Sequence, residues 1–297
     1  MRGIFKYFLA GALAFGAGSL PAYAQAGCAP EFAQNARTVT VAGLEIGTGE
    51  RAQEDFSINI RNRGENACSA FLRIARRRPV SPADQIEILI QGGGRLLEIL
   101  PNQSTPGATG SDLFVPNIPI ISSGRTVPFR LGFATEWGLE RGSIAQEFVL
   151  TLHDQAGTEL DSMILIVRID VPSAVALRIV GASGNNPVRR INLGILDPQE
   201  INRSDPFGLR IWSTAPYQVE FSSENMGKLR KTTSLATIPY SLRMSGAEID
   251  LEANDQRVFP RGTGSLGDFH PLRVVVDPFF AEAGNYNDRI QVSVSAI

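Results

Sequence analysis

The chain has 297 residues, of which 43% are hydrophobic and 20% charged, and its formal net charge at pH 7 is −2. A charge this close to zero implies neither a nucleic-acid partner nor an anionic membrane surface. The length suits two domains of ordinary size, each large enough to bury its own core.

The first 24 residues have the features of a secretory signal sequence. Arg2 and Lys6 give it a positively charged start. The stretch from Tyr7 to Leu20 is apolar but too short and too rich in glycine to span a membrane. Ala22-Tyr23-Ala24 is a small-x-small cleavage site. We therefore expect an exported chain that begins near Gln25.

Cys28 and Cys68 are the only cysteines in the sequence. In an oxidising compartment, two cysteines most simply form one disulfide. In the loop-entropy model, closing a loop of about 40 residues stabilises a fold by roughly 3–4 kcal/mol. The alternative is a pair of free thiols.

The region from residue 25 to residue 172 has the pattern of a β-sandwich. Its strand-like runs are Thr38–Ile46, Phe56–Ile60, Cys68–Ile74, Asp84–Ile90, Arg95–Leu100, Val127–Phe133, Ala145–His153 and Leu160–Val171. Turn residues separate these runs, and the segments Gly92-Gly93-Gly94 and Asp154–Gly157 predict hairpins.

A second β-sandwich is predicted over residues 173–297. Pro172 ends a strand and marks the domain boundary. Further strand-like runs are Val175–Val180, Val188–Leu196, Phe207–Ser213, Tyr217–Phe221, Ile238–Met244 and Leu272–Val276. No amphipathic helix lies among them. The pattern indicates an all-β chain of two tandem immunoglobulin-like antiparallel β-sandwiches.

The last strand of the sequence alternates strictly. From Arg289 onward, Ile290, Val292 and Val294 fall on one face and polar residues on the other. An apolar strand with an unpaired edge is an aggregation hazard unless something covers it. Either an earlier strand of the same chain covers this edge, or another chain does.

Three segments of the second half resemble motifs of spore coat protein U domains. They are Asn192-Leu-Gly-Ile-Leu-Asp-Pro198, similar to FGxxxP, Ile238-Pro-Tyr-Ser-Leu242, similar to LPYxLY, and Ala283-Gly-Asn-Tyr-Asn-Asp288, similar to AGxYxD. The first half is similar more loosely, around Cys28, Gly43–Gly47 and Cys68. This second half lacks the disulfide usual in such domains, and Ser241-Leu242-Arg243 replaces the usual aromatic ending.

The resemblance implies assembly through the archaic chaperone–usher pathway. Pilin domains of that pathway are sandwiches that lack their last strand, which implies the same for the C-terminal domain here. A periplasmic chaperone fills the gap first, and at the outer-membrane usher an adjacent pilin's donor strand replaces it by β-strand addition. Ile290, Val292 and Val294 are then expected to line the groove that receives this strand.

The resemblance also implies a place in the fibre. A donating subunit needs a free alternating segment ahead of its first strand, but Cys28 closely follows the predicted cleavage point and Pro30 interrupts the region after it. We therefore expect a tip adhesin that passes through the periplasm to the cell surface. Its N-terminal domain is expected to attach to a host or abiotic surface and to support biofilm formation.

The segment from Pro101 to Arg125 is the predicted surface-binding loop, because its four prolines argue against a central strand. Its apolar residues are Leu113, Phe114, Val115, Ile118, Ile120 and Ile121. Contact with a hydrophobic surface removes water from exposed apolar side chains, and this burial lowers the free energy. The alternative is that they pack against the sandwich edge. Trp137 is a second candidate contact, against the alternative of a buried tryptophan.

The sequence carries no motif for catalysis. Its two histidines, His153 and His270, fit neither an HExxH pattern nor a spacing with three metal ligands. No nucleophile elbow, P-loop or dinucleotide fingerprint is present, although two carboxylates brought together by folding are an open alternative. We expect no enzyme, cofactor or metal. The alternative functions are a secreted coat or matrix protein complete in itself, and a minor shaft subunit of a pilus.

Overall fold

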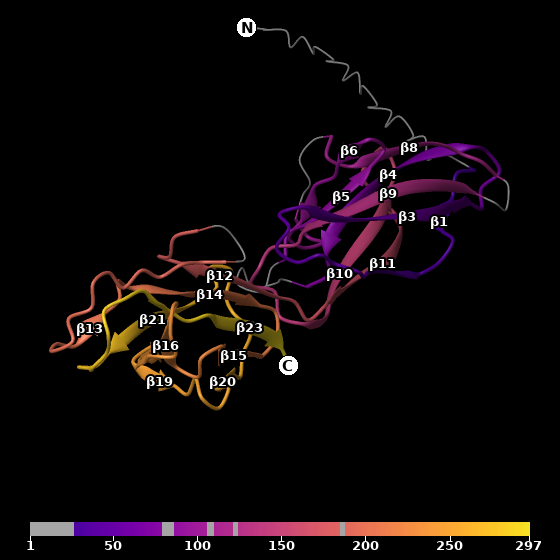
Figure 1. The fold of residues 1–297 in the computed structure, drawn as a ribbon. Helices are drawn as coiled ribbons and strands as arrows, with labels where there is room; N and C mark the ends of the chain where they lie inside the picture. Colours follow the sequence, from indigo (N-terminus) through magenta and orange to yellow (C-terminus); the bar gives the residue numbers. More distant parts are fainter. Residues whose placement is uncertain (1–26, 79–85, 106–109, 121–123, 185–187) are drawn as a thin grey trace, which may run out of the picture.

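A computed structural model describes residues 27–78, 86–105, 110–120, 124–184 and 188–297 (Figure 1). The predicted signal sequence lies outside these residues. Within them the chain forms strands and no helix, which confirms the all-β prediction. No helix in the described part is therefore long and apolar enough to cross a membrane.

The described residues of the N-terminal half form eleven strands. They are β1 (Pro30–Phe32), β2 (Ala36–Val41), β3 (Arg51–Asn62), β4 (Cys68–Arg76), β5 (Ile88–Gly92), β6 (Arg95–Leu96), β7 (Ile99–Leu100), β8 (Leu113–Ile118), β9 (Arg125–Ala134), β10 (Gly142–His153) and β11 (Glu159–Val171). One sheet has the order β1-β3-β9-β5-β6. The other has the order β2-β11-β10-β4-β7, with β8 also paired to β4.

Both hairpins predicted for this half are confirmed. β10 and β11 pair along their whole length across the turn at Asp154–Gly157. β5 and β6 pair across Gly93 and Gly94, whose φ angles of 59° and 79° suit a two-residue turn that requires glycine.

The sheets of this half are mainly antiparallel, with two parallel pairings that the sequence did not predict. β2 runs parallel to β11, and β7 runs parallel to β4. β1 pairs with β3 in one sheet, and the chain then crosses to the other sheet as β2. Because β2 comes from across the sandwich and not from a hairpin, no tight turn forces it to be antiparallel to β11.

In the C-terminal half, the part of the chain that the structure describes forms twelve strands. They are β12 (Val175–Val180), β13 (Asn202–Arg203), β14 (Phe207–Ser213), β15 (Tyr217–Ser223), β16 (Lys228–Lys231), β17 (Thr237–Pro239), β18 (Ser241–Met244), β19 (Ala247–Ile249), β20 (Gln256–Phe259), β21 (Asp268–Val276), β22 (Tyr286–Asn287) and β23 (Ile290–Ala296). The main sheet has the order β12-β14-β21-β18-β19, with β13 on β21. Opposite it lie two three-stranded sheets, β20-β15-β23 and β17-β16-β22. The expected strand Val188–Leu196 forms only a single bridge, between Ser183 and Arg190.

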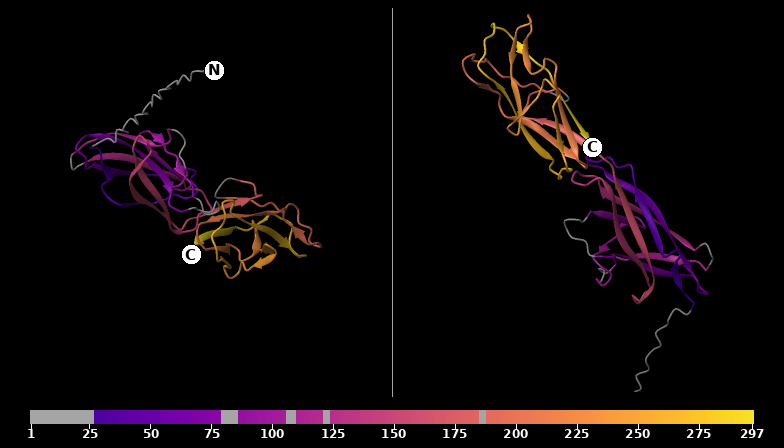
Figure 2. Two further views of the ribbon diagram at one scale, coloured as in Figure 1. Left: turned by 180° about the vertical axis from the view of Figure 1, so that it is seen from behind. Right: turned by 90° about the horizontal axis from the view of Figure 1, so that it is seen from below.

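The two halves have separate hydrophobic cores. The buried members of the first core lie between Phe32 and Val171, and those of the second between Phe207 and Val276. Figures 1 and 2 show the halves end to end. At their junction the Arg141 N–H donates a 2.7 Å hydrogen bond to the Thr214 carbonyl. A domain boundary at Pro172 is compatible with this arrangement and stays a proposal.

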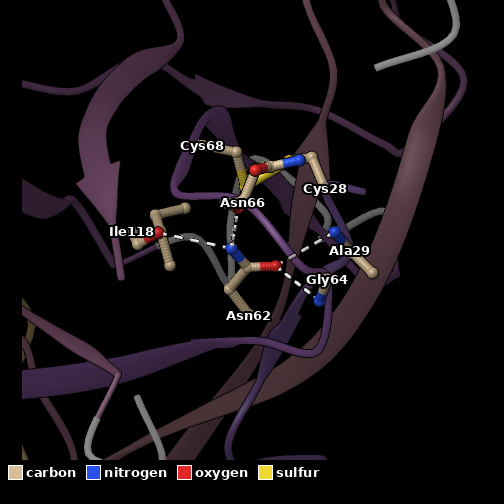
Figure 3. The surroundings of a disulfide bond; sticks show 7 residues. All are labelled: Cys28, Ala29, Asn62, Gly64, Asn66, Cys68 and Ile118. Carbon is tan, nitrogen blue, oxygen red and sulfur yellow. Dashed lines mark hydrogen bonds between the residues drawn. A yellow bond between two sulfur atoms is a disulfide. The ribbon is translucent and has the colours of Figure 1, made fainter. Parts of the chain in front are cut away.

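The predicted disulfide between Cys28 and Cys68 is confirmed, with a Cα–Cα distance of 5.7 Å (Figure 3). Beside it the buried Asn62 side chain joins the start of the described chain to the β3–β4 turn. Its Oδ1 accepts hydrogen bonds from the Ala29 and Gly64 N–H groups at 3.1 and 2.8 Å. Its Nδ2 donates a 2.7 Å hydrogen bond to the Asn66 carbonyl. The disulfide and this amide together hold the start of the described chain against the β3–β4 turn.

Candidate functional site

The C-terminal half contains an apolar strand that is covered on one side only. Ile290, Val292 and Val294 on β23 are all half-buried. β23 pairs only with β15 in the described part of the chain. The β15 residues opposite Val294 and Val292 are Val219 and Phe221, and both are 0% exposed. The apolar side chains of β15 are therefore completely buried, whereas those of β23 at the sheet edge are only partly buried.

β12 shows the same pattern at the edge of the facing sheet. Leu177 and Ile179 are half-buried. Their partners on β14, Ile211 and Leu209, are 0% exposed. β12 and β23 lie close together, so two incompletely covered edges face the same opening of the sandwich.

A cavity of about 720 Å³ lies at this opening. Ile179, Ile290 and Val292 line it from the two edges. Apolar side chains of the central strands, including Leu209 and Val274, form its floor. We call this cavity the groove. Residues from two strand edges line its sides and core side chains line its floor, which is the arrangement that β-strand addition requires.

Val294, the third residue predicted for this site, packs against the core but does not line the cavity. Sequence reasoning missed two other lining residues, Ile191 and Leu193, which lie in the segment expected to be a strand. Their apolar alternation was visible in the sequence. This alternation could not show that the segment packs beside the groove without pairing in a sheet.

The N-terminal half offers an internal comparison. Its long strand β11 has β2 on one side and β10 on the other. Its inward residues Met163, Leu165, Val167 and Ile169 are at most 1% exposed. Among the described residues, the sandwich is therefore closed around β11 and open beside β23.

A half-buried carboxylate fixes the start of β23. Asp288 Oδ2 accepts hydrogen bonds of 2.6 Å from both the Tyr240 and Ser223 hydroxyls. Its Oδ1 accepts hydrogen bonds from the Asn225 and Arg289 N–H groups at 3.0 and 2.8 Å. Burial, together with the hydrogen bond to Asp288, raises the pKa of Tyr240. Asp288 and Tyr240 both line the groove, where they form a fixed polar end.

A second polar cluster links the two sheets near the other end of β23. The Tyr217 hydroxyl donates a 3.0 Å hydrogen bond to Asp268 and lies 2.9 Å from His270 Nε2. Burial lowers the pKa of His270, and the charge of Asp268 acts in the opposite direction. Tyr217 is 0% exposed, so the cluster joins the two sheets from within the core.

No group of three or more His, Cys, Asp or Glu side chains in the described residues is placed to hold a metal ion.

Three of the six residues predicted to form an exposed surface-binding loop lie in the core instead. Leu113, Val115 and Ile118 belong to strand β8 and are 6%, 2% and 0% exposed. β8 lies at a sheet edge, where proline is tolerated, and a bulge opposite Cys68–Ala70 takes up Pro116.

Two of the predicted surface residues do face solvent. Phe114 and Ile120 are 52% and 55% exposed. Phe114 also packs on Phe71, with ring centroids 5.2 Å apart. Ile121 lies outside the described residues. Trp137 is half-buried, packs against the first core, and lines a separate cavity of about 690 Å³ together with Arg51 and Ser265.

Comparison with protein-family models gives no match, and comparison with curated proteins gives none either. Among solved structures, a chain of the CsuC–CsuE chaperone–tip adhesion subunit complex from archaic chaperone-usher Csu pili of Acinetobacter baumannii is 11% identical. It matches over 90% of this chain and 99% of that one, with a TM-score of 0.40. The CupB6 tip adhesin from Pseudomonas aeruginosa is 11% identical, over 90% and 94% of the two chains, with a TM-score of 0.37.

A third solved structure is CfaE, the adhesive subunit of CFA/I fimbria of enterotoxigenic Escherichia coli. It is 12% identical over 90% of this chain and 81% of that one, with a TM-score of 0.36. These are distant likenesses, and they assign neither a family nor a partner to this chain.

Proposed function

We propose that this chain is a non-enzymatic subunit of a chaperone–usher pilus that accepts a donor strand in the groove between β12 and β23. One observation carries the proposal. Apolar residues on both edges, such as Ile179 and Val292, are half-buried, whereas the residues one strand inward are fully buried. An added strand covers both rows at once and hydrogen-bonds to the free edge of β23.

The junction with the N-terminal half limits how a donor strand enters. The Arg141 side chain donates a 3.0 Å hydrogen bond to the main-chain oxygen of Ile297, directly after β23. The groove end near Ala296 therefore adjoins the N-terminal half. A donor whose body follows its strand must lie at the Ile290 end, and its strand then runs antiparallel to β23.

The wider role that we propose is that of a tip adhesin. The chain is exported, a periplasmic chaperone fills the groove first, and an outer-membrane usher exchanges the chaperone for an adjacent pilin. The N-terminal half attaches to a host or abiotic surface and supports biofilm formation. Phe114 and Ile120 are the contacts we propose, because their exposed side chains are available to such a surface, whereas Leu113, Val115 and Ile118 are core residues.

The test is thermal unfolding of residues 25–297 with synthetic donor-segment peptides from pilins encoded beside this chain's gene. Each peptide must be long enough to pair with all seven residues of β23. At about 100 times the Kd a ligand adds roughly 2.7 kcal/mol. Since about 1 kcal/mol shifts the Tm of a domain of this size by roughly 4 °C, we expect a rise of about 10 °C in the C-terminal transition.

Peptides of the same composition in shuffled order are the matched control, and they should leave the transition unchanged. If the chain is already stable and indifferent to every peptide, the groove is no acceptor site. The secreted coat or matrix protein, complete in itself, then becomes the better account.

A further inference from the structure

The two ends of the C-terminal half differ in what surrounds them. At one end the Thr214 carbonyl accepts the hydrogen bond from the N-terminal half. β12 and β14 pair from Val175–Ser213 at that end to Val180–Gly208 at the other. At the opposite end, which we call the far end, β13 pairs with the last residues of β21, and residues 195–201 and 277–285 extend beyond this pair (Figure 1).

The far end carries apolar side chains that no part of the described chain covers. Ile195 and Phe280 are 100% and 105% exposed. Ile201 is 47% exposed. The Phe279 N–H donates a 3.0 Å hydrogen bond to the Pro198 carbonyl, so the two loops are joined. Exposed apolar side chains gathered at one end of a domain indicate a contact surface.

This exposed surface is continuous with the groove. Ile191 and Leu193 line the groove. Ile195 is the next alternate residue of the same segment, and its side chain is fully exposed. The apolar surface therefore continues past the groove onto the far end.

We infer that the far-end surface, made up of Ile195, Ile201 and Phe280, binds the folded body of the pilin whose donor strand enters the groove. The inference rests on the proposed function. A strand lying in the groove leaves it at one of two ends, and the N-terminal half occupies one of them. The body of the donor therefore lies against the far end, where the exposed apolar side chains are.

The experiment compares an Ile195→Ser/Phe280→Ser double variant with the unchanged chain. Its probes are the synthetic donor peptide and the whole pilin encoded beside the gene, which carries the same donor segment. Leu266→Ser is the matched control, because Leu266 is 80% exposed and its neighbour Ser265 lies against Gly138 of the N-terminal half. Both variants should retain the unchanged chain's Tm, since the replaced side chains are exposed.

We expect the double variant to bind the whole pilin at least about tenfold more weakly and the peptide with unchanged affinity, with Leu266→Ser altering neither. Equal pilin affinity in the double variant and the unchanged chain overturns the inference but leaves the proposed function intact. A loss of peptide affinity also overturns it, because the residues then act on the groove itself. Weakened binding of a periplasmic chaperone alone assigns the surface to the chaperone and overturns it too. If the peptide fails to bind the unchanged chain, the proposed function fails first.

Discussion

Replacing valine by threonine at one core position and one groove position distinguishes the energetic roles of the core and the groove. Val219 is 0% exposed on β15, whereas Val292 on the neighbouring strand is half-buried and lines the groove. The change keeps the shape of the side chain and adds a hydroxyl, whose burial without a partner costs about 1–3 kcal/mol. Val219→Thr should lower the free energy of unfolding of the free chain by that amount. Val292→Thr should lower it by less than about 1 kcal/mol, because the hydroxyl still reaches water.

The order reverses when a donor strand is bound. A donor strand removes water from Val292, so the hydroxyl of Val292→Thr should weaken peptide binding by about 1–2 kcal/mol, which is roughly 5- to 30-fold in Kd. Urea denaturation of the free chains and calorimetric titration with the donor peptide measure the two quantities. The reasoning is refuted if Val292→Thr destabilises the free chain as much as Val219→Thr does, or if it leaves the peptide Kd unchanged.

Two further predictions concern the polar clusters. Tyr240→Phe removes a hydroxyl that donates to the Asp288 carboxylate, and urea denaturation at pH 7 should show a loss of about 1.5–3 kcal/mol. A loss below about 0.5 kcal/mol would mean that water replaces this donor without penalty. Since the pKa of His270 is lowered from 6.5 on folding, the unfolded chain binds more protons. The stability that neutral His270 contributes is complete above pH 6.5 and should be lost as the pH falls below it toward the lowered pKa. His270→Gln should flatten this part of the urea-midpoint profile between about pH 5 and 7, and an unchanged profile contradicts the assignment.

The sequence predicted the elements whose signals are local. Alternation along β10, β11 and β23 is a property of consecutive residues, so these strands and the β10–β11 hairpin could be located. The parallel pairing of β2 with β11 is a contact between distant segments, and no local pattern encodes it. The same limit applies to the groove. Alternation showed that Val292 is apolar on one face, but only the packed structure shows which edge of its strand lacks a neighbour.

The failures have specific causes. Pro116 argued against a strand, but β8 is an edge strand and its bulge accommodates the ring. Apolar residues that looked like an exposed loop were therefore core residues. The role of Asp288 could not be predicted, because a single aspartate carries no signal of its own in the sequence. Its hydrogen bonds to Tyr240 and Ser223 come from segments that are far away in sequence.

The groove between β12 and β23 also has a consequence for the rate of folding. β12 is the first strand of the C-terminal half and β23 the last, so the edges that face each other across the groove are separated by nearly the whole half. Contacts between distant segments form slowly, because the intervening chain must be ordered first. Without a strand between them these two edges stay exposed longest, during the period when unpaired edges recruit other chains. A partner that inserts a strand there acts as a template as well as a ligand. It connects β12 and β23, the two edges that the chain on its own brings together last.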